Sequence, residues 1–195
     1  MKTIERRDVA PAPELYIPEA EVPVKGTRIW AILRISFGWV FLWAFLDKLL
    51  ALGFSTGRNE ETGVIDFFGE AAWINGASPT EGFLAFGTKG PFADFFQGLA
   101  GSAWVDWVYM LSMAAIGLAL ILGIGMRLAA IGAIIWLGLF YVAGSIWPEN
   151  NPFIDDHVIY AIALAGLAYI GAGRTWGLGR WWESTALVKK FPVLK

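Results

Sequence analysis

The sequence has 195 residues, of which 56% are hydrophobic and 16% are charged, and its mean hydropathy is +0.54. Soluble proteins carry about 25% charged residues, so this composition indicates an integral membrane protein. The absence of cysteine excludes disulfides, cysteine-ligated zinc and iron–sulfur clusters, and the single histidine excludes bis-histidine haem and a histidine-cluster metal site. The net charge of −2 gives no indication of a nucleic-acid partner, and we predict none.

The first 29 residues contain charged side chains of both signs and four prolines but no apolar run. This pattern excludes a signal peptide or a membrane span there, and we predict a Pro-rich cytoplasmic tail over 1–29. Four apolar segments follow, and each helical crossing needs about 20 apolar residues. The predicted spans cover about 30–52, 104–122, 128–147 and 156–172, and a basic cytoplasmic tail covers 183–195.

The distribution of lysine and arginine predicts the orientation, because cytoplasmic segments carry an excess of these residues. With both termini inside, the inner segments hold eleven lysines and arginines, whereas the outer loops hold Arg58 and Lys89. We therefore predict a multi-pass protein of the bacterial plasma membrane with both termini in the cytoplasm.

The connections between the spans differ in kind. Gly123–Arg127 is a short, glycine-rich segment, so the second and third spans are predicted to be antiparallel neighbours. The outer loop 53–103 is long and rich in aromatic residues, which argues against disorder. We expect short amphipathic helices on the outer bilayer interface near 63–73 and 91–99. The predicted fold class is an all-α membrane protein, a four-helix bundle with a long, partly helical outer loop.

The first span contains three ionisable residues, which are expensive inside a membrane and indicate function by default. Arg34 lies about one turn from the inner interface, and Asp47 and Lys48 lie near the outer one. A structural interpretation is that Arg34 and Lys48 extend to lipid headgroups on their own sides. The shorter side chain of Asp47 does not reach that far, which favours a functional role for it.

A second polar cluster, Pro148–His157, precedes the fourth span. A structural interpretation makes Asn151 the N-cap residue of a helix that starts at Pro152, with Asp155 or Asp156 favoured by the helix dipole. The functional interpretation places Asp156 and His157 beside Asp47 and Lys48 in an outer polar pocket, where the imidazole would exchange protons. The sequence is compatible with both interpretations. These four residues are the catalytic candidates, and we assign no metal.

A third segment, Trp73–Leu84, contains the turn-forming pairs Asn75-Gly76 and Ser78-Pro79. Its default interpretation is a structural turn in which Ser78 or Thr80 caps a short helix.

The sequence resembles the DoxX/DoxD family of small bacterial membrane proteins, in its actinobacterial form. The resemblance covers about Arg28 to Trp182. It is carried by the motifs Leu33-Arg-Ile, Gly38, Phe41 and Leu46-Asp-Lys48, by Trp73–Leu84 and Phe86–Phe92, and by Gly117–Arg127, Glu149–Tyr160, Gly171–Arg174 and Gly177–Trp182.

The resemblance implies a four-helix bundle and, by the DoxD branch, the membrane subunit of a thiosulfate:quinone oxidoreductase. Quinone is then the expected cofactor, with Arg34, Trp39, Trp43 and Tyr160 as candidate residues of a quinone or lipid pocket. The alternative is a non-catalytic accessory subunit of a larger respiratory or cell-envelope complex. The expected partners are membrane lipids and membrane-associated redox proteins, or a second copy of this chain. Because the chain has no cysteine, no thiol relay operates within it.

Overall fold

The computed structural model describes residues 27–195, so the predicted tail over 1–29 falls almost wholly outside the described residues. The described part is helical and contains no strand, apart from an isolated bridge between Arg58 and Ile65. The predicted all-α class is confirmed.

Three helices are long and apolar enough to cross a membrane within the described range. Helix α1 covers Thr27–Leu50, and α3 covers Ala103–Leu122. Helix α4 covers Met126–Phe140 and continues through the wider turn η4, Tyr141–Ser145. Helix α5, Asp156–Tyr169, is apolar but has 14 residues, which corresponds to about 21 Å. These bounds agree with the predicted spans to within a few residues at most ends.

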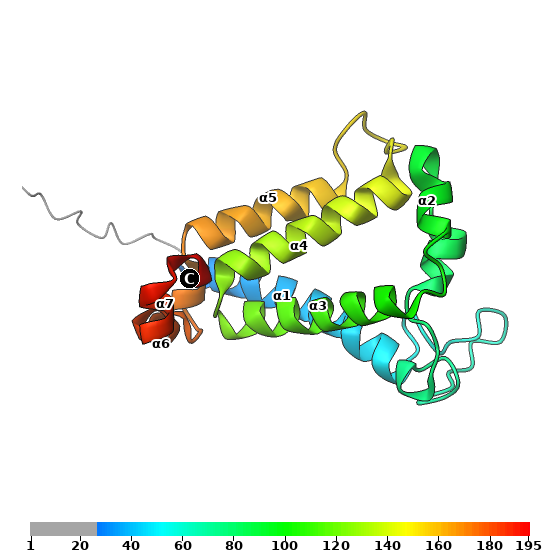
Figure 1. The fold of residues 1–195 in the computed structure, drawn as a ribbon, viewed down its shortest axis with the longest axis horizontal. Coiled ribbons are helices and arrows are strands. Elements are labelled where there is room, and N and C mark those ends of the chain that lie inside the picture. Colours follow the sequence, from blue (N-terminus) through cyan, green and yellow to red (C-terminus); the bar gives the residue numbers. More distant parts are fainter. Residues whose placement is uncertain (1–26) are drawn as a thin grey trace, which may run out of the picture.

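The helices are arranged as two packed pairs (Figure 1). Helix α1 packs on α3 and α4 packs on α5, while α3 and α4 join the two pairs. The turn between α3 and α4 places Gly123 at φ +71° and Gly125 at φ +56°, a conformation that glycine adopts without strain. The predicted antiparallel packing of these two neighbours is confirmed.

Two glycines bring α1 and α3 close together. A Cβ atom on Gly117 would lie 2.6 Å from the backbone nitrogen of Leu42, and one on Gly38 would lie 2.8 Å from the backbone nitrogen of Ile121. Lipid tails are as apolar as the helix surfaces, so such backbone proximity and van der Waals packing hold membrane helices together.

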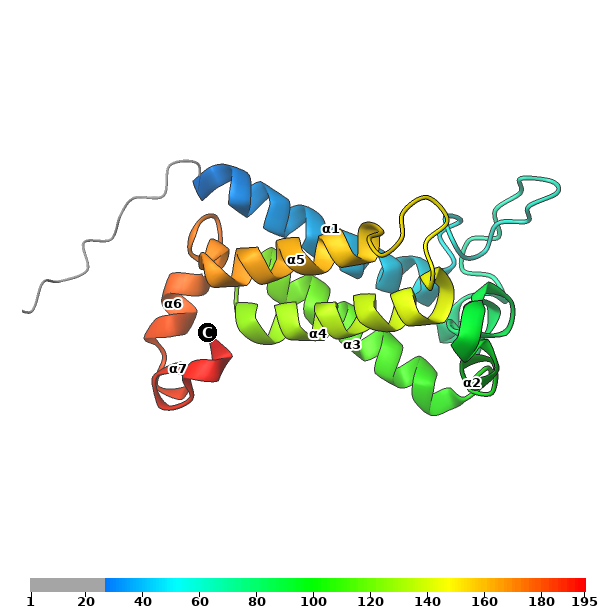
Figure 2. The same ribbon diagram turned by 90° about the horizontal axis from the view of Figure 1, so that it is seen from above.

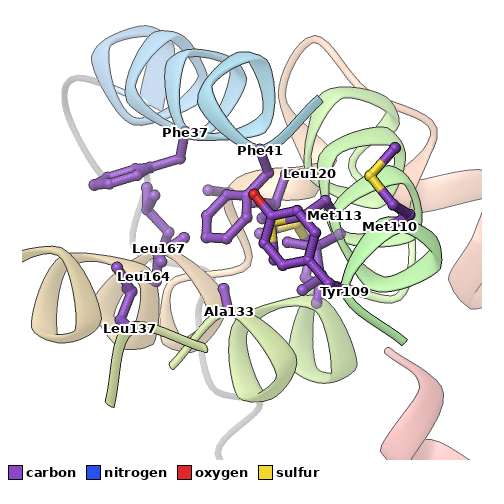
Figure 3. Packing of buried hydrophobic residues seen from close by; sticks show 14 residues of the cluster. Phe37, Phe41, Tyr109, Met110, Met113, Leu120, Ala133, Leu137, Leu164 and Leu167 are labelled. Carbon is purple, nitrogen blue, oxygen red and sulfur yellow. The ribbon is translucent and has the colours of Figure 1, made fainter. Parts of the chain in front are cut away.

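The buried core lies between all four helices (Figure 3). Tyr109 and Met113 reach into it from α3, and the ring of Tyr109 points towards Phe41 of α1. Leu137 of α4 and Leu164 and Leu167 of α5 complete the same cluster. Edge-on contacts between aromatic rings, such as Tyr109 against Trp136 at 5.4 Å, fix the relative rotation of the helices.

The two ends of the bundle carry different structures (Figures 1 and 2). The loop end, where α1 ends and α3 begins, is covered by residues 51–102. That cover contains η1 (Trp73–Asn75), η2 (Phe83–Gly87), η3 (Gly90–Phe92) and α2 (Ala93–Gln97). The Arg34 end, where α1 begins and α3 ends, is covered by η5 (Ala172–Arg174), α6 (Gly179–Ser184), α7 (Ala186–Lys190) and η6 (Pro192–Leu194).

One of the two helices expected in the loop forms, and their place on the outer bilayer interface stays a prediction. Helix α2 forms within the expected 91–99, but no helix forms over 63–73. Instead, the backbone nitrogen of Asn59 donates to Val64 O at 2.9 Å and that of Asp66 donates to Gly57 O at 2.8 Å. These bonds and the Arg58–Ile65 bridge fold the segment back on itself, which removes the donors that a helix would need.

Candidate functional site

An apolar cavity of about 510 Å³ lies at the loop end, between α3, α4 and the covering segments η2 and α2. Aromatic and aliphatic side chains form almost all of its wall. Lys48 is the one formally charged residue among the described residues that line it. Thr80, Trp104, Tyr109 and Trp136 are the other lining residues with side-chain hydrogen-bond donors. We call this space the Lys48 cavity.

The wall of the Lys48 cavity is buried on one side and exposed on the other. Leu84, Tyr109 and Ala143 are 6%, 7% and 1% exposed. Ile135 and Val108 lie on the surface of the helix pair and are 57% and 52% exposed. The outer part of the wall is therefore formed by exposed apolar side chains of α3 and α4, two of the helices long and apolar enough to cross a membrane.

A second cavity, of about 440 Å³, lies between α1 and α5. Asp156, His157 and Tyr160 line it from α5, and Phe37 of α1 packs edge-on against Tyr160 at a ring-centroid distance of 5.4 Å. We call it the His157 cavity. Tyr109 and Phe140 line both cavities and therefore form part of the wall between them.

The start of α5 fixes His157 in place. Asp155 is the N-cap residue, and its Oδ1 accepts a hydrogen bond from the backbone nitrogen of Val158 at 3.2 Å. Its Oδ2 lies 2.7 Å from His157 Nδ1, and Asp156 Oδ1 lies 3.4 Å from the same nitrogen. A carboxylate on one ring nitrogen orients the imidazole and leaves Nε2 for acid–base chemistry.

The prediction that Asn151 caps this helix is wrong. Its Oδ1 accepts from the backbone nitrogens of Phe153 and Ile154 at 3.1 and 3.0 Å, which closes a turn that ends before α5 begins. An asparagine side chain commonly bonds to the backbone two residues on, and here that local bond is formed in place of the cap.

Asp155, Asp156 and His157 each offer one ligand atom to a metal ion, and these atoms lie within 4.8 Å of one another. Both oxygens of Asp155 already serve the helix cap and the imidazole. Because Asp155 orients the imidazole, we interpret the group as acid–base in character, and the absence of a metal stays a prediction.

Asp47 is 1% exposed and stabilises the start of the loop. Its carboxylate accepts from the backbone nitrogens of Phe54 and Ser55 at 3.1 and 2.9 Å, and from Ser55 Oγ at 2.7 Å. These charge-assisted bonds replace the solvation that the buried carboxylate loses.

The structure does not bring all four catalytic candidates together. No hydrogen bond or ion pair joins Asp47 or Lys48 to Asp156 or His157 among the described residues. Lys48 lines one cavity, whereas Asp156 and His157 line the other. Asp47 has its own hydrogen-bond partners in the loop and is not part of the outer polar pocket that the functional interpretation placed there.

The four candidates for a quinone or lipid pocket are also separated. Tyr160 lines the His157 cavity. Trp39 is 51% exposed and packs on Trp43, which in turn packs on Phe54 at a ring-centroid distance of 5.0 Å. The two tryptophans line neither the Lys48 cavity nor the His157 cavity.

Arg34, the fourth candidate, lies at the opposite end and is fully buried. Its guanidinium donates to Leu120 O, to Ile121 O at 2.8 Å, and to Thr175 O and Trp176 O at 3.2 and 2.9 Å. The expectation that it extends to lipid headgroups is wrong. The last turn of a helix has carbonyls without helical partners, and Arg34 satisfies two of them at the end of α3.

Sequence reasoning missed Asp106, which is 6% exposed at the start of α3. Its Oδ1 accepts from Ser78 Oγ at 2.9 Å and from the nitrogen and Oγ of Thr80 at 3.2 and 2.6 Å. The signal was present, because an acid within an apolar span is as unusual at position 106 as at position 47. The expected turn at Ser78 forms, and its Oγ accepts from the backbone nitrogen of Glu81 at 3.2 Å.

Comparison of the chain with family models, with curated proteins and with solved structures finds no match.

Proposed function

We propose that this chain is a membrane subunit of a redox system and that it binds a quinone in the Lys48 cavity. The observation that carries the proposal is the cavity itself, an apolar space with one cation among the described residues of its wall and with exposed apolar side chains of α3 and α4 on its outer part. Quinones dissolve in the bilayer, carry a flat ring that fits among aromatic side chains, and present carbonyl oxygens that accept hydrogen bonds.

The residues of the cavity suit such a ligand. Small-molecule sites have volumes of roughly 300–1,000 Å³ and a few placed polar groups in an apolar wall. Lys48 would hold one carbonyl by a charge-assisted hydrogen bond. Trp104, Tyr109 and Trp136 offer further donors, whereas Thr80 is already bound to Asp106. A bound quinone supplies two-electron, two-proton chemistry, with electrons from a partner protein.

The His157 cavity supplies the acid–base group that this chemistry requires. Asp155 orients the imidazole, and Tyr109 borders both cavities. We therefore propose that His157 holds and releases protons beside the ligand site.

A binding experiment tests the proposal directly. The chain, reconstituted in nanodiscs, is titrated with decylubiquinone while its tryptophan fluorescence is followed, because quinones quench nearby tryptophans. Replacing Lys48→Met removes the charged donor, and we expect the affinity to fall about tenfold. The matched control is Lys89→Met, which lies outside the cavity. Equal affinity in both variants would overturn the proposal.

The membrane topology belongs to the same proposal: four spans, with α5 and its flanking segments as the fourth, in the bacterial plasma membrane. Both termini would be cytoplasmic. Because the sequence has no cysteine, Thr3→Cys and Glu60→Cys place single reporters on the two sides. In intact cells an impermeant maleimide should label position 60 and leave position 3 unlabelled. The reverse pattern would invert the topology.

The second candidate function is a non-catalytic accessory subunit, with a partner docked on the loop end. The observation that favours it is the exposure of aromatic side chains there, with Phe86 at 87% and Phe54 at 71%. Gentle purification followed by mass spectrometry separates the two candidates. A stable co-purifying protein with no retained quinone, lost in Phe86→Ser, would favour the accessory function.

A further inference from the structure

The Arg34 end carries a small polar pocket that the proposed function does not use. It has a volume of about 110 Å³ and lies between the start of α4, the turn that follows α5 and the C-terminal segment. Arg127, Arg174 and Lys195 contribute basic side chains to its wall, and Glu183 contributes the one acidic side chain among the described lining residues.

Fixed contacts build this pocket. The backbone nitrogen of Arg127 donates to Lys195 O at 2.8 Å, and its guanidinium donates to Pro192 O at 3.2 Å, which ties the C-terminal segment to α4. Arg174 forms a two-point ion pair with Glu183, with Nη2 and Oε2 3.0 Å apart. The carboxylate is therefore already neutralised, and the wall keeps an excess of positive charge.

Apolar side chains project from the same end. Trp176 and Trp181 are 58% and 60% exposed, and Leu187 is 52% exposed. Helices α6 and α7 lie across the ends of the long helices (Figure 1). Aromatic residues and short helices with exposed apolar side chains are typical of the membrane–water interface, where the rings enter the headgroup layer.

We propose that this pocket binds the headgroup of an anionic phospholipid. The basic wall matches the negative phosphate, and the exposed tryptophans and leucine would contact the first carbons of the acyl chains. A free phosphate ion shares the charge but has no apolar part, so it would gain nothing from those side chains. The site is separate from both cavities and does not depend on quinone binding.

The test is native mass spectrometry of the full chain released from nanodiscs that contain equal amounts of phosphatidylglycerol and phosphatidylcholine. We expect the wild type to retain phosphatidylglycerol selectively. The double variant Arg127→Gln/Lys195→Gln should lose this retention about tenfold without a change in retained phosphatidylcholine. The matched control is Arg58→Gln/Lys89→Gln at the loop end, which should retain phosphatidylglycerol like the wild type.

A third variant should change the retention of phosphatidylglycerol in the opposite direction. Glu183→Gln removes the carboxylate from the wall, so the retained phosphatidylglycerol should rise. Melting temperatures of all variants are measured beside the lipid signal, and the comparison uses those within 2 °C of the wild type. Equal retention in wild type and double variant would overturn the proposal. So would displacement of the lipid by millimolar inorganic phosphate, which would indicate a site for the free ion.

Discussion

At both ends of the bundle, buried charged side chains form hydrogen bonds with backbone groups, but the side chains at the two ends have opposite charges. At the Arg34 end, a buried guanidinium donates to carbonyls of α3 and of the segment after α5. At the loop end, the buried carboxylates of Asp47 and Asp106 accept from backbone nitrogens and hydroxyls. Both arrangements follow from the polar groups at hand, because helix ends leave carbonyls unpaired and turns leave amides unpaired.

The comparison also explains where the cavities lie. The Arg34 end is closed by one residue that joins three segments, and its turns pack backbone on backbone. At the loop end the two carboxylates hold separate loop segments, and the Lys48 cavity lies between η2, α2, α3 and α4. The larger ligand site requires such space, whereas the tightly packed Arg34 end leaves the small polar pocket of about 110 Å³.

The largest expected effect is at Arg34. Arg34→Met keeps much of the apolar stem but leaves four carbonyls without this donor, and we expect a loss of about 3–5 kcal/mol in unfolding free energy. The melting temperature in detergent should fall by roughly 10 °C. The matched control is Arg58→Met at the loop end, an exposed arginine that donates to Gly53 O. A similar loss in both variants would remove the distinction between the ends.

A pair of glycine substitutions measures how tightly each end is packed. Gly123 at the Arg34 end and Gly76 in the loop both have positive φ, at 71° and 96°. A Cβ on Gly123 would lie 2.7 Å from Gly173 O, whereas one on Gly76 would meet nothing within 4 Å.

Both alanine variants should therefore lose about 1–2 kcal/mol through backbone strain, and Gly123→Ala should lose about 1–3 kcal/mol more through crowding. Thermal unfolding of the two variants checks this. Equal melting temperatures would show that the Arg34 end is as free to adjust as the loop.

The two carboxylates should act locally and independently. Asp47→Ala should speed amide exchange at Phe54 and Ser55, and Asp106→Ala should speed it at Thr80, with about 1–3 kcal/mol lost at each site. Hydrogen–deuterium exchange with peptide-level readout separates these segments. Glu60→Ala, at an exposed loop position, serves as the control. Faster exchange across the whole loop in either variant would mean that the cover is one cooperative unit.

The sequence was sufficient for the helices and their turns because these are local features. Continuous apolar runs marked α1, α3 and α4, and the glycines of the 123–127 turn predicted the antiparallel pair. Helix α5 begins at Asp156, the first residue of the predicted fourth span, but the helix start at Pro152 with Asn151 as its cap was wrong.

The site was only partly predictable, because sequence gives the depth of a residue in the membrane but not the direction it faces. Lys48 and His157 were placed at the same depth, yet they line different cavities. The partners of Arg34 are backbone carbonyls far along the chain, and no residue type marks a carbonyl as unpaired. Asp47 was interpreted as functional because it does not reach the lipid headgroups, whereas the loop eight residues later supplies it with hydrogen-bond donors.

The smallest expected effect is at the start of α5, where two variants of Asp155 distinguish its role as a helix cap from its role in orienting His157. Asp155→Asn keeps a good N-cap residue, so the unfolding free energy should change by less than about 0.5 kcal/mol, whereas Asp155→Ala should lose about 1 kcal/mol. Both variants remove the nearer of two carboxylates from His157 Nδ1, because Asp155 Oδ2 lies 2.7 Å away in the wild type, whereas Asp156 Oδ1 lies 3.4 Å away. His157 is the single histidine of the sequence, so ¹⁵N NMR of a histidine-labelled sample reports on this ring alone. We expect the wild type to carry its proton on Nδ1 when neutral, because the carboxylate accepts there, and both variants to shift towards the Nε2-protonated form. An unchanged spectrum in Asp155→Asn would mean that Asp155 acts only as a helix cap, and the oriented acid–base group would then be lost from the proposed function.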